Sequence, residues 1–189
     1  DLLDLSKLEA GKMSVEFGSA DLAATANQVA TEFQTLAAEK NVSVRCQINA
    51  NDTLIDLDNN RIGQLIRNLL ANALRFSPPG SEVVLSIDEA SMMAGRRRCD
   101  RISVPALQLA VLDSGPGIPE AEFETIFEKF IQSSTTKTGA GGTGLGLAIC
   151  REIALLHAGE IRASNRPEGG AQFTLLLPRK QLSNTDFNT

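Results

Sequence analysis

Hydrophobic residues recur along the chain with two different spacings, which predict an alternation of helices and strands. Apolar residues four and three positions apart predict an amphipathic helix over residues 21–39. A second helix is predicted from Asp58, a favourable N-cap residue, to about Arg75, because a Ser-Pro-Pro-Gly sequence follows. A third helix is predicted from about Thr143, where the apolar residues again fall on one face.

Short segments rich in apolar residues, in which alternate positions are often polar, predict the strands of a sheet. These segments are residues 42–48, 53–56, 82–88, 106–113, 160–164 and 171–177. We expect residues 82–88 and 106–113 to form an antiparallel pair, joined by a connection that is longer than most hairpin loops. Residues 119–130, which begin with a proline and contain three phenylalanines, predict a short helix.

The composition favours one folded domain. The chain has 189 residues, of which 42% are hydrophobic and 22% are charged, so a mainly disordered chain is excluded. Its 18 Lys and Arg against 23 Asp and Glu give a net charge of −5, which argues against a general nucleic-acid binder. No apolar run reaches the roughly 20 residues of a membrane-spanning helix. We therefore expect a soluble, cytoplasmic fragment.

The cysteines and the single histidine exclude several other classes of protein. Cys46, Cys99 and Cys150 are widely separated and form no Cys-x-x-Cys pair, which excludes a disulfide scaffold and a His/Cys zinc site. His157 is the only histidine of the chain. No G-x-S-x-G sequence accompanies it, so a Ser-His-Asp hydrolase is not indicated.

Two glycine-rich segments and one polar stripe are the candidates for chemistry. Asn68, Asn72 and Arg75 are four and three residues apart, so they form a stripe beside the apolar face of their helix. Asp113 begins a Gly-x-Gly segment directly after a strand, where backbone can approach a flat ligand and the carboxylate can accept from an exocyclic amine. The glycine run of residues 139–146 opens into a helix, whose N-terminal N–H groups favour phosphate.

Each of these features taken alone also fits a structural role. The two asparagines fit amides on a helix surface, and the glycine runs fit a tight turn and a flexible loop. Neither run is a Walker A sequence or a good Rossmann fingerprint. The arginines of residues 96–101 fit either a solvated loop or a site for an acidic partner.

Taken together and in order, the motifs resemble the catalytic, ATP-binding domain of sensor histidine kinases, which has the Bergerat ATP-binding fold. Residues 58–77 resemble the N box of that family, 113–119 the G1 box, 123–130 the F box, 142–149 the G2 box and 157–178 the closing hairpin. The resemblance implies an α+β fold. This fold is a two-layer α/β sandwich in which a mixed, mostly antiparallel sheet packs on about three helices.

The resemblance also implies a division of the chain. Residues 1–11 resemble the end of a dimerisation helix, 12–20 a linker and 21–178 the catalytic domain, and residues 179–189 are predicted to be a polar tail. The phosphoacceptor histidine of the family has no match in the chain, so we expect it upstream, on the dimerisation domain. His157 follows the G2 helix, and we predict a structural role for it.

The resemblance implies that the ligands are ATP and Mg²⁺. Asn72 matches the asparagine that ligates the Mg²⁺ bridging the phosphates, and Arg75 matches a basic residue that contacts phosphate. Phe76 matches an aromatic residue beside the adenine, and Asp113 matches the aspartate that receives the adenine amino group. The implied catalytic residues are Asn68, Asn72 and Arg75.

The remaining implied contacts come from the other boxes. Gly115, Gly117 and Ile118 match the floor of the adenine pocket. Residues 131–142 match the ATP lid, and Phe127, Lys129 and Phe130 match residues that pack beneath it, with Lys129 as a phosphate contact. The turn that contacts phosphate matches Gly142, Thr143, Gly144, Leu145, Gly146 and Leu147. Ala171 stands where the family often has Ser or Thr, which removes one polar contact near the adenine.

One position indicates the type of reaction. Related ATPases of this fold carry a Glu four residues before the Mg²⁺ asparagine, as a general base for water. The chain has Asn68 there, and an amide cannot take the proton. This suits a kinase, in which catalysis is mostly positioning and charge neutralisation. The implied partners are the phosphoacceptor domain of the same protein and the receiver domain of a response regulator.

Alternatives to a histidine kinase stay open at this point. A catalytically silent, nucleotide-gated interaction module of the same fold is the second hypothesis, and an ATP-hydrolysing clamp, which Asn68 disfavours, is the third. Since family dimers form through the helix that precedes the domain, we expect the parent protein to be a homodimer and the fragment a monomer. The sequence leaves open whether the parent is anchored in the inner membrane.

Overall fold

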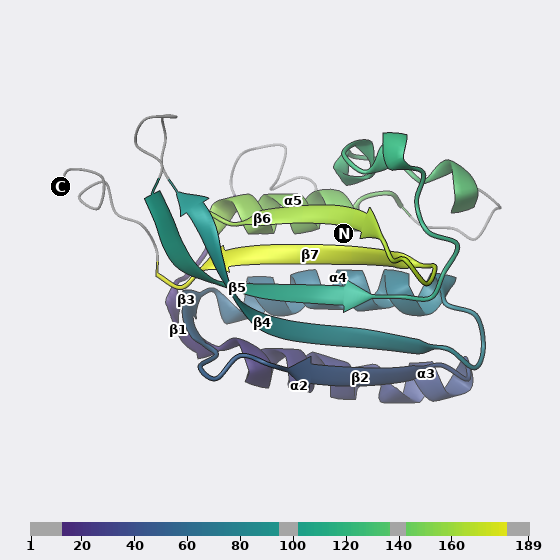
Figure 1. Cartoon of the computed structure of the whole chain (residues 1–189), viewed down its shortest axis with the longest axis horizontal. Coiled ribbons are helices and arrows are strands. Elements are labelled where there is room, and N and C mark those ends of the chain that lie inside the picture. The colour runs from purple at the N-terminus through teal and green to yellow at the C-terminus, as the bar shows by residue number, and fades with distance from the viewer. Residues whose placement is uncertain (1–12, 95–101, 137–142, 181–189) are drawn as a thin grey trace.

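The computed structural model describes residues 13–94, 102–136 and 143–180, and within these a sheet forms one layer and helices form the other (Figure 1). The sheet has five strands in the order β2-β4-β5-β7-β6. Neighbouring strands are antiparallel except β2 and β4, which are parallel. The strands are β2 (Ser43–Ile48), β4 (Glu82–Ala94), β5 (Ile102–Leu112), β6 (Glu160–Asn165) and β7 (Ala171–Pro178).

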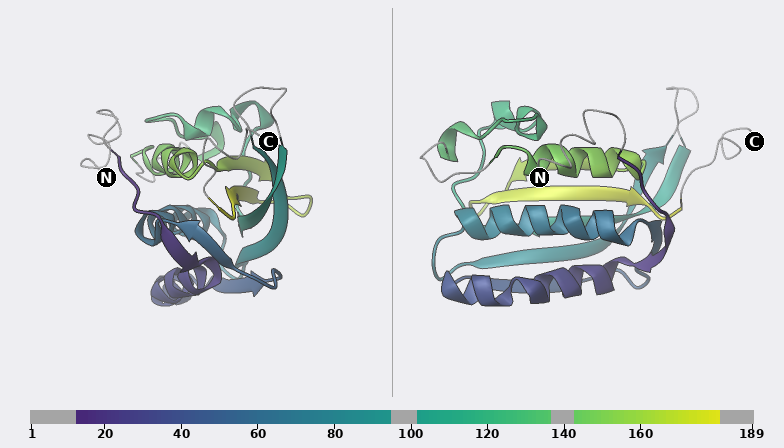
Figure 2. Two further views of the ribbon diagram at one scale, coloured as in Figure 1. Left: turned by 90° about the vertical axis from the view of Figure 1, so that its left-hand side faces the viewer. Right: turned by 180° about the vertical axis from the view of Figure 1, so that it is seen from behind.

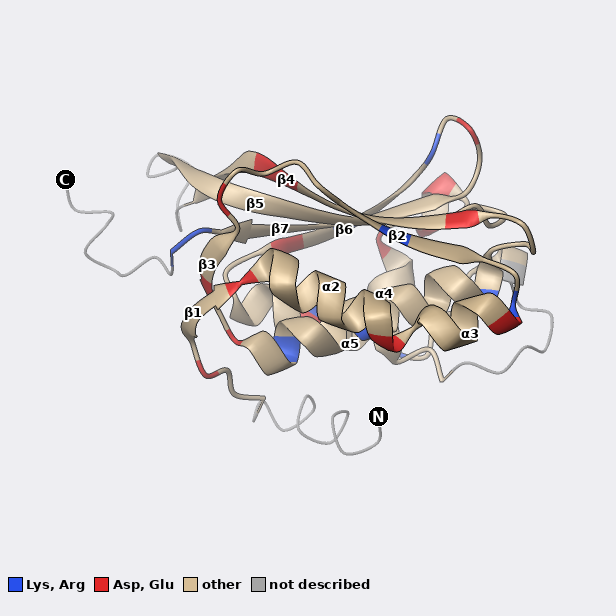
Figure 3. Ribbon diagram, turned by 90° about the horizontal axis from the view of Figure 1, so that it is seen from below, with Lys and Arg blue, Asp and Glu red and all other residues tan. Residues whose placement is uncertain are grey.

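The helices lie side by side on one face of this sheet (Figures 2 and 3). They are α2 (Leu22–Glu32), α3 (Gln34–Glu39), α4 (Asn59–Phe76) and α5 (Gly146–Leu156). Helix α4 is the central one. Its apolar face, which includes Leu65, Leu69 and Leu70, is fully buried against the sheet and the neighbouring helices. This is the α+β, two-layer sandwich with a mixed sheet that the sequence predicted.

The N-terminus of α4 forms where the sequence predicts it. The Asp58 side chain accepts hydrogen bonds from the backbone N–H groups of Asn60 (3.0 Å) and Arg61 (3.0 Å), which are otherwise unsatisfied in a first helical turn. Asp21 caps α2 in the same way, through the N–H groups of Ala23 and Ala24. The two caps fix the positions at which the chain turns into the helical layer.

Two predicted elements are divided or moved. The helix predicted over residues 21–39 is interrupted at Phe33, so α2 and α3 are separate. The short helix predicted over residues 119–130 is instead two 3-10 turns, η1 (Glu120–Glu122) and η2 (Thr125–Phe127). Helix α5 begins at Gly146, three residues after the predicted start, because Gly144 has a φ of +68°, outside the range of a right-handed helix.

Other segments predicted as irregular are strands. Residues 18–21, at the end of the predicted linker, form β1 (Gly18–Asp21), which pairs antiparallel with β3 (Leu54–Leu57). The connection expected between β4 and β5 is largely an extension of both strands, which pair as far as Ala94 and Ile102. Arg96–Arg98 and Arg101, on which two hypotheses were left open, lie outside the described residues. So do residues 1–12 and all of the predicted tail after Lys180.

The first residue of the predicted tail belongs to the fold. The Arg179 guanidinium donates to the backbone carbonyls of Asp52 (2.8 Å) and Leu54 (3.3 Å), and its N–H donates to the carbonyl of Pro105 (3.0 Å). The bonds of the guanidinium join the end of β7 to the start of β3, and the bond of the N–H joins it to β5. Among the described helices, none is both long enough and apolar enough to cross a bilayer.

His157 is a structural residue, as predicted. It is fully buried at the end of α5, its Nδ1 donates to the carbonyl of Ile153 (2.7 Å), and its Nε2 accepts from the N–H of Asp58 (3.0 Å). The ring of Phe17 lies edge-on against it, with centroids 5.2 Å apart. The imidazole therefore ties the end of α5 to the start of α4, and it does so in the neutral form.

The stability of the chain is expected to fall in mild acid because of His157. Burial lowers the pKa of His157 below its ordinary 6.5, against the opposing effects of the Ile153 carbonyl and the Asp58 carboxylate. The unfolded chain therefore takes up a proton at a higher pH than the folded chain, and the free energy of unfolding falls as the pH drops through 6.5. Each unit by which the pKa is lowered removes about 1.4 kcal/mol. Urea unfolding at a series of pH values from about 7.5 to 5 measures this.

The matched variant is His157→Gln, which keeps one acceptor and one donor but does not titrate. This variant should be less stable at neutral pH, because it loses the packing of the buried ring. Since the chain has no other histidine, its free energy of unfolding should also depend less steeply on pH over the same range. The same slope in both proteins would contradict the assignment.

Candidate ATP-binding site

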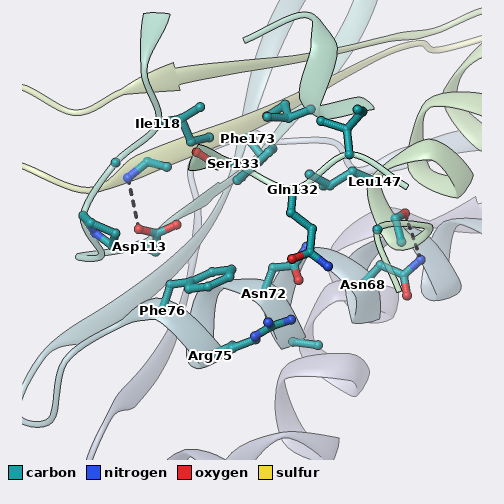
Figure 4. Close-up of a pocket in the computed structure, with 18 of the residues that line it drawn as sticks. Asn68, Asn72, Arg75, Phe76, Asp113, Ile118, Gln132, Ser133, Leu147 and Phe173 are labelled. Atoms are coloured by element: carbon teal, nitrogen blue, oxygen red, sulfur yellow. Dashed lines mark hydrogen bonds between the residues drawn. The ribbon is translucent and has the colours of Figure 1, made fainter. Parts of the chain in front are cut away.

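A cavity of about 350 Å³ opens between α4, the loop after β5 and the start of α5 (Figure 4). This volume lies at the lower end of the range for small-molecule sites. The cavity is lined by Asn68, Ala71, Asn72, Arg75, Phe76, Asp113, Pro116, Gly117, Ile118, Ile126, Ile131, Gln132, Ser133, Thr143, Gly144, Gly146, Leu147, Ala171 and Phe173. Parts of all four sequence boxes therefore meet at one place, although they are up to about a hundred residues apart.

Asp113 lies at the end of β5, and one of its two carboxylate oxygens is hydrogen-bonded within the protein. Its Oδ1 accepts from the N–H groups of Gly115 (2.8 Å) and Ala171 (3.0 Å), and within the described residues no hydrogen bond reaches Oδ2. The side chain is only 5% exposed. Burial raises the pKa of Asp113, while the two N–H donors and Arg166 oppose that rise. A buried carboxylate with one open oxygen is an acceptor that an exocyclic amino group can satisfy.

Three polar residues of α4 line the cavity together, as the four-and-three spacing predicts. Figure 4 shows Asp113 and Phe76 at one end of the cavity and Asn68 at the other, with Asn72 and Arg75 between them. The Nδ2 of Asn68 donates to the carbonyl of Gly146 (3.3 Å), which fixes the amide against the first turn of α5.

Arg75 supplies the positive charge among the described residues that line the cavity. Its guanidinium lies over the Phe76 ring, 4.9 Å from the centroid, in a cation–π contact. Its Nε is buried and has no hydrogen-bond partner in the described part of the chain. A buried donor without a partner costs free energy, so this nitrogen favours binding of an anion nearby.

The glycine segment before α5 lies against the F-box segment. Gly144 has a φ of +68°, and its carbonyl accepts from the N–H of Phe130 (2.9 Å). A Cβ at this position would lie 2.8 Å from the Phe130 backbone, so only glycine permits this approach. Helix α5 then begins at Gly146, and no side chain among the described residues caps it, which leaves its first N–H groups available at the cavity.

Several predicted contact residues do not line the cavity. Gly115 lies behind it and donates to Asp113. Phe127 is buried in the core, where its ring lies edge-on to that of Phe173. Lys129, Phe130 and Leu145 also lie away from the cavity, and Phe130 is 63% exposed. Gly142 falls outside the described residues.

Other lining residues were not predicted to contact the ligand. These are Ala71, Pro116, Ile126, Ile131, Gln132, Ser133, Ala171 and Phe173. Ala71 follows from the helix itself, since it lies three residues after Asn68 and one turn before Arg75. Ala171 and Phe173 line the cavity from β7. The family resemblance already placed Ala171 near the adenine. No local sequence signal marks Phe173, because strand alternation only separates the two faces of β7.

The comparison with known families agrees with this geometry. The family described as "Histidine kinase-, DNA gyrase B-, and HSP90-like ATPase" matches residues 57–181. This is the greater part of the chain, and the chain belongs to that family.

Within that family the chain is most like histidine kinases. It is 38% identical over 181 residues to hybrid signal transduction histidine kinase D of Dictyostelium discoideum, and the match covers 94% of the chain. The chain spans less than half of the length of the curated relatives it matches, and only 11% of this one.

The fold is likewise that of solved histidine kinases. The catalytic domain of histidine kinase ThkA is 28% identical, with a TM-score of 0.70 over 88% of this chain and 98% of that one. Full-length ShkA in complex with AMPPNP has a TM-score of 0.75 over 96% of this chain and 35% of its own. At 24% identity, the second match shows the fold alone.

Proposed function

We propose that this chain is the ATP-binding, catalytic part of a sensor histidine kinase, which transfers the γ-phosphate of ATP to a histidine outside the chain. The observation that carries the proposal is the polarity of the cavity. Asp113 offers an acceptor at one end, and Arg75 offers a positive charge further along α4. ATP has the matching polarity, with an amino group on its base and negative charge on its phosphates. ShkA, which shares the fold, was solved with the ATP analogue AMPPNP.

The base end of the site follows from the groups around Asp113. Its open Oδ2 would accept from the adenine amino group, and the apolar side chains of Ile118 and Phe173 would contact the ring. Phe76 would close the same end from α4. Ala171 offers only a methyl group to this region, so Asp113 carries the polar recognition.

The phosphate end would be held by α4 and by the start of α5. Arg75 would place its unsatisfied Nε toward the phosphates, and the N–H groups at the start of α5 would add a helix N-terminus. Asn72 would hold Mg²⁺ through its amide oxygen. Mg²⁺ is usually bound by one or two protein oxygens together with substrate phosphates, so this single ligand fits. When bound, Mg²⁺ would neutralise charge on the phosphates.

The position of Asn68 favours transfer over hydrolysis. Its amide is fixed by the carbonyl of Gly146 and cannot take a proton from water. The γ-phosphate would thus be kept for another nucleophile, and catalysis would consist of orientation and charge neutralisation. His157 does not compete as acceptor, because it is fully buried and both of its nitrogens are engaged.

The partners follow from the same proposal. The phosphoacceptor histidine would lie on a dimerisation domain of the parent homodimer, joined to this domain through residues 1–11 and the segment that precedes β1. The receiver domain of a response regulator would take the phosphoryl group next. Histidine kinase ThkA was solved in complex with a response regulator protein, TrrA. The cytoplasm, where ATP is available, is the compartment that such a reaction requires.

Transfer from ATP to an added acceptor tests the proposal. The chain, mixed with Mg²⁺, γ-labelled ATP and a separately produced dimerisation domain of the parent protein, is expected to label the histidine of that domain and not itself. Asp113→Ala should bind ATP about tenfold more weakly, because a hydrogen bond to a charged group is lost. Calorimetry measures the binding, and acid-labile label measures the transfer.

The controls separate the two parts of this proposal. Asp88→Ala makes the same change at a carboxylate on β4 outside the cavity and should leave ATP binding unchanged. ATP binding without transfer to any acceptor would contradict the kinase assignment. Wild-type affinity in Asp113→Ala would contradict the assignment of the adenine acceptor.

A further inference from the structure

The turn between β6 and β7 wraps around the loop that forms the base end of the cavity. Asn165, the last residue of β6, and Arg166, the first residue of the turn, bond to that loop at opposite ends. We call Asn165 and Arg166 the hairpin brace, and residues 113–118 the adenine loop. Neither brace residue lines the cavity. Both lie within the closing hairpin of residues 157–178, but neither was predicted to contact the ligand.

Asn165 holds the far end of the adenine loop by two hydrogen bonds. Its Oδ1 accepts from the N–H of Ile118 (2.9 Å), and its Nδ2 donates to the carbonyl of the same residue (2.8 Å). The amide also lies directly against Gly117, where an added Cβ would come within 2.9 Å of Oδ1. The backbone of Gly117 has a φ of +75°, which glycine adopts readily. Asn165 therefore fixes the position of the Ile118 backbone, and with it the place of the Ile118 side chain in the cavity wall.

Arg166 holds the near end of the loop. Its Nη1 donates to the backbone carbonyl of Asp113 (2.8 Å), and its own N–H closes the hairpin turn by donating to Gly170 (3.0 Å). Its positive charge also opposes the rise in the pKa of Asp113 that burial causes. Arg166 thus acts on the position of the Asp113 backbone and on the charge of its carboxylate.

The other side-chain contacts of this loop are longer. The N–H of Ser114 donates to the Ser77 hydroxyl at 3.4 Å, and the Ser114 hydroxyl donates to the carbonyl of Glu82 at 3.3 Å. The hydroxyl of Thr135 reaches the carbonyl of Gly117 at 3.3 Å. The shortest side-chain bonds that reach this loop from outside it, apart from the Asp113 carboxylate itself, come from the brace.

We propose that Asn165 and Arg166 are positioning residues that set nucleotide-base selectivity, by holding Asp113 and Ile118 at the spacing that fits an adenine. The proposal rests on the function proposed above. Adenine carries an amino group where guanine carries a carbonyl oxygen, so the carboxylate of Asp113 accepts from the first and repels the second. This discrimination depends on the distance between carboxylate and base. If the adenine loop can shift by a fraction of an ångström, the preference for adenine over guanine falls by more than the affinity for either nucleotide.

The test is the ratio of two affinities in the whole chain. Calorimetry with Mg²⁺ and either AMPPNP or GMPPNP gives the preference of each variant for adenine. Asn165→Ala and Arg166→Ala are each expected to weaken AMPPNP about fivefold, the effect of one typical hydrogen bond. The affinity for GMPPNP should fall less or not at all, so the ratio of the AMPPNP affinity to the GMPPNP affinity falls. Transfer to an added acceptor domain at saturating ATP should stay within about twofold of wild type, since neither residue reaches the phosphates.

Matched controls lie on the same strand. Ser164→Ala changes the residue next to the brace, and Arg162→Ala removes an exposed arginine paired with Glu160, so neither should alter the ratio. Arg166→Lys, which keeps the charge, should recover part of the preference. If Asn165→Ala does not fold, Arg166→Ala carries the test through a separate contact.

Two failures are distinguishable. If the wild-type chain binds neither nucleotide, the proposed function is wrong and this proposal with it. If the wild type prefers AMPPNP and the brace variants keep the same ratio, or lose both nucleotides equally, the brace has only a structural role and the proposal alone is overturned.

Discussion

Replacing Asn72 by alanine is expected to lower the rate of phosphoryl transfer by about 10²–10³-fold. This is the cost of removing one preorganised group that stabilises developing charge. Asn72 lines the cavity from α4 and is the residue proposed to hold Mg²⁺. Asp113 and the rest of the base end stay intact in this variant, so ATP binding should weaken less than transfer does. Single-turnover transfer from γ-labelled ATP, together with calorimetry, measures both effects.

The matched control for this variant is Asn60→Ala, which makes the same change on the same helix at an exposed position outside the cavity. It should transfer phosphate at the wild-type rate. Loss of ATP binding in Asn72→Ala as large as its loss of transfer would mean that Asn72 contributes to binding alone. Transfer at the wild-type rate would remove Asn72 from the catalytic set.

Introducing a carboxylate at position 68 is expected to raise the release of free phosphate by roughly 10- to 100-fold. A well-placed general base contributes about 10²–10⁴-fold, and a base in a site that does not position water contributes less. Asn68 lies one helical turn before Asn72 on the cavity side of α4. The structure adds a cost to Asn68→Glu, because the bond that Nδ2 makes to the Gly146 carbonyl is lost. Phosphate release and ATP affinity must therefore be measured together.

The control that isolates the base is Asn68→Gln. Glutamine has the length of glutamate and can still donate to Gly146, but it does not accept a proton. A rise in phosphate release in Asn68→Glu alone supports the interpretation of Asn68. An equal rise in both variants would show that lengthening the side chain is sufficient, and no rise in either would show that a missing base does not limit hydrolysis.

The sequence predicted those parts of the fold that depend on local pattern. Helix α4 and its cap at Asp58 follow from periodicity and from one side chain, and both are confirmed. The long β4–β5 hairpin was missed because the alternation fades after Asp88 and Pro105 interrupts it, although pairing with a neighbouring strand still extends both. Residues 18–20 were predicted to be linker, because a strand of four residues is recognisable only with its partner β3.

The same holds for the site: residues that a local pattern brings together could be predicted, and contacts between distant segments could not. Asn68, Asn72 and Arg75 lie on one stripe of one helix, so their spacing alone brought them together. Asn165 bonds to Ile118, 47 residues before it in the chain, and no local spacing records a contact of that kind. Lys129 was expected near phosphate because of its place in the F box. It is not among the residues that line the cavity, and the segment before it forms two 3-10 turns where a helix was predicted.

The bond between His157 and Asp58 gives helix α5 a pivot. An 11-residue helix is about 16 Å long, and α5 is fastened at its last turn, at the end opposite the cavity. Any tilt about that fastening displaces Leu156 least and Gly146 most. Substitutions near His157 should therefore change the free energy of unfolding of the domain. Substitutions near Gly146 should change how fast a nucleotide enters and leaves.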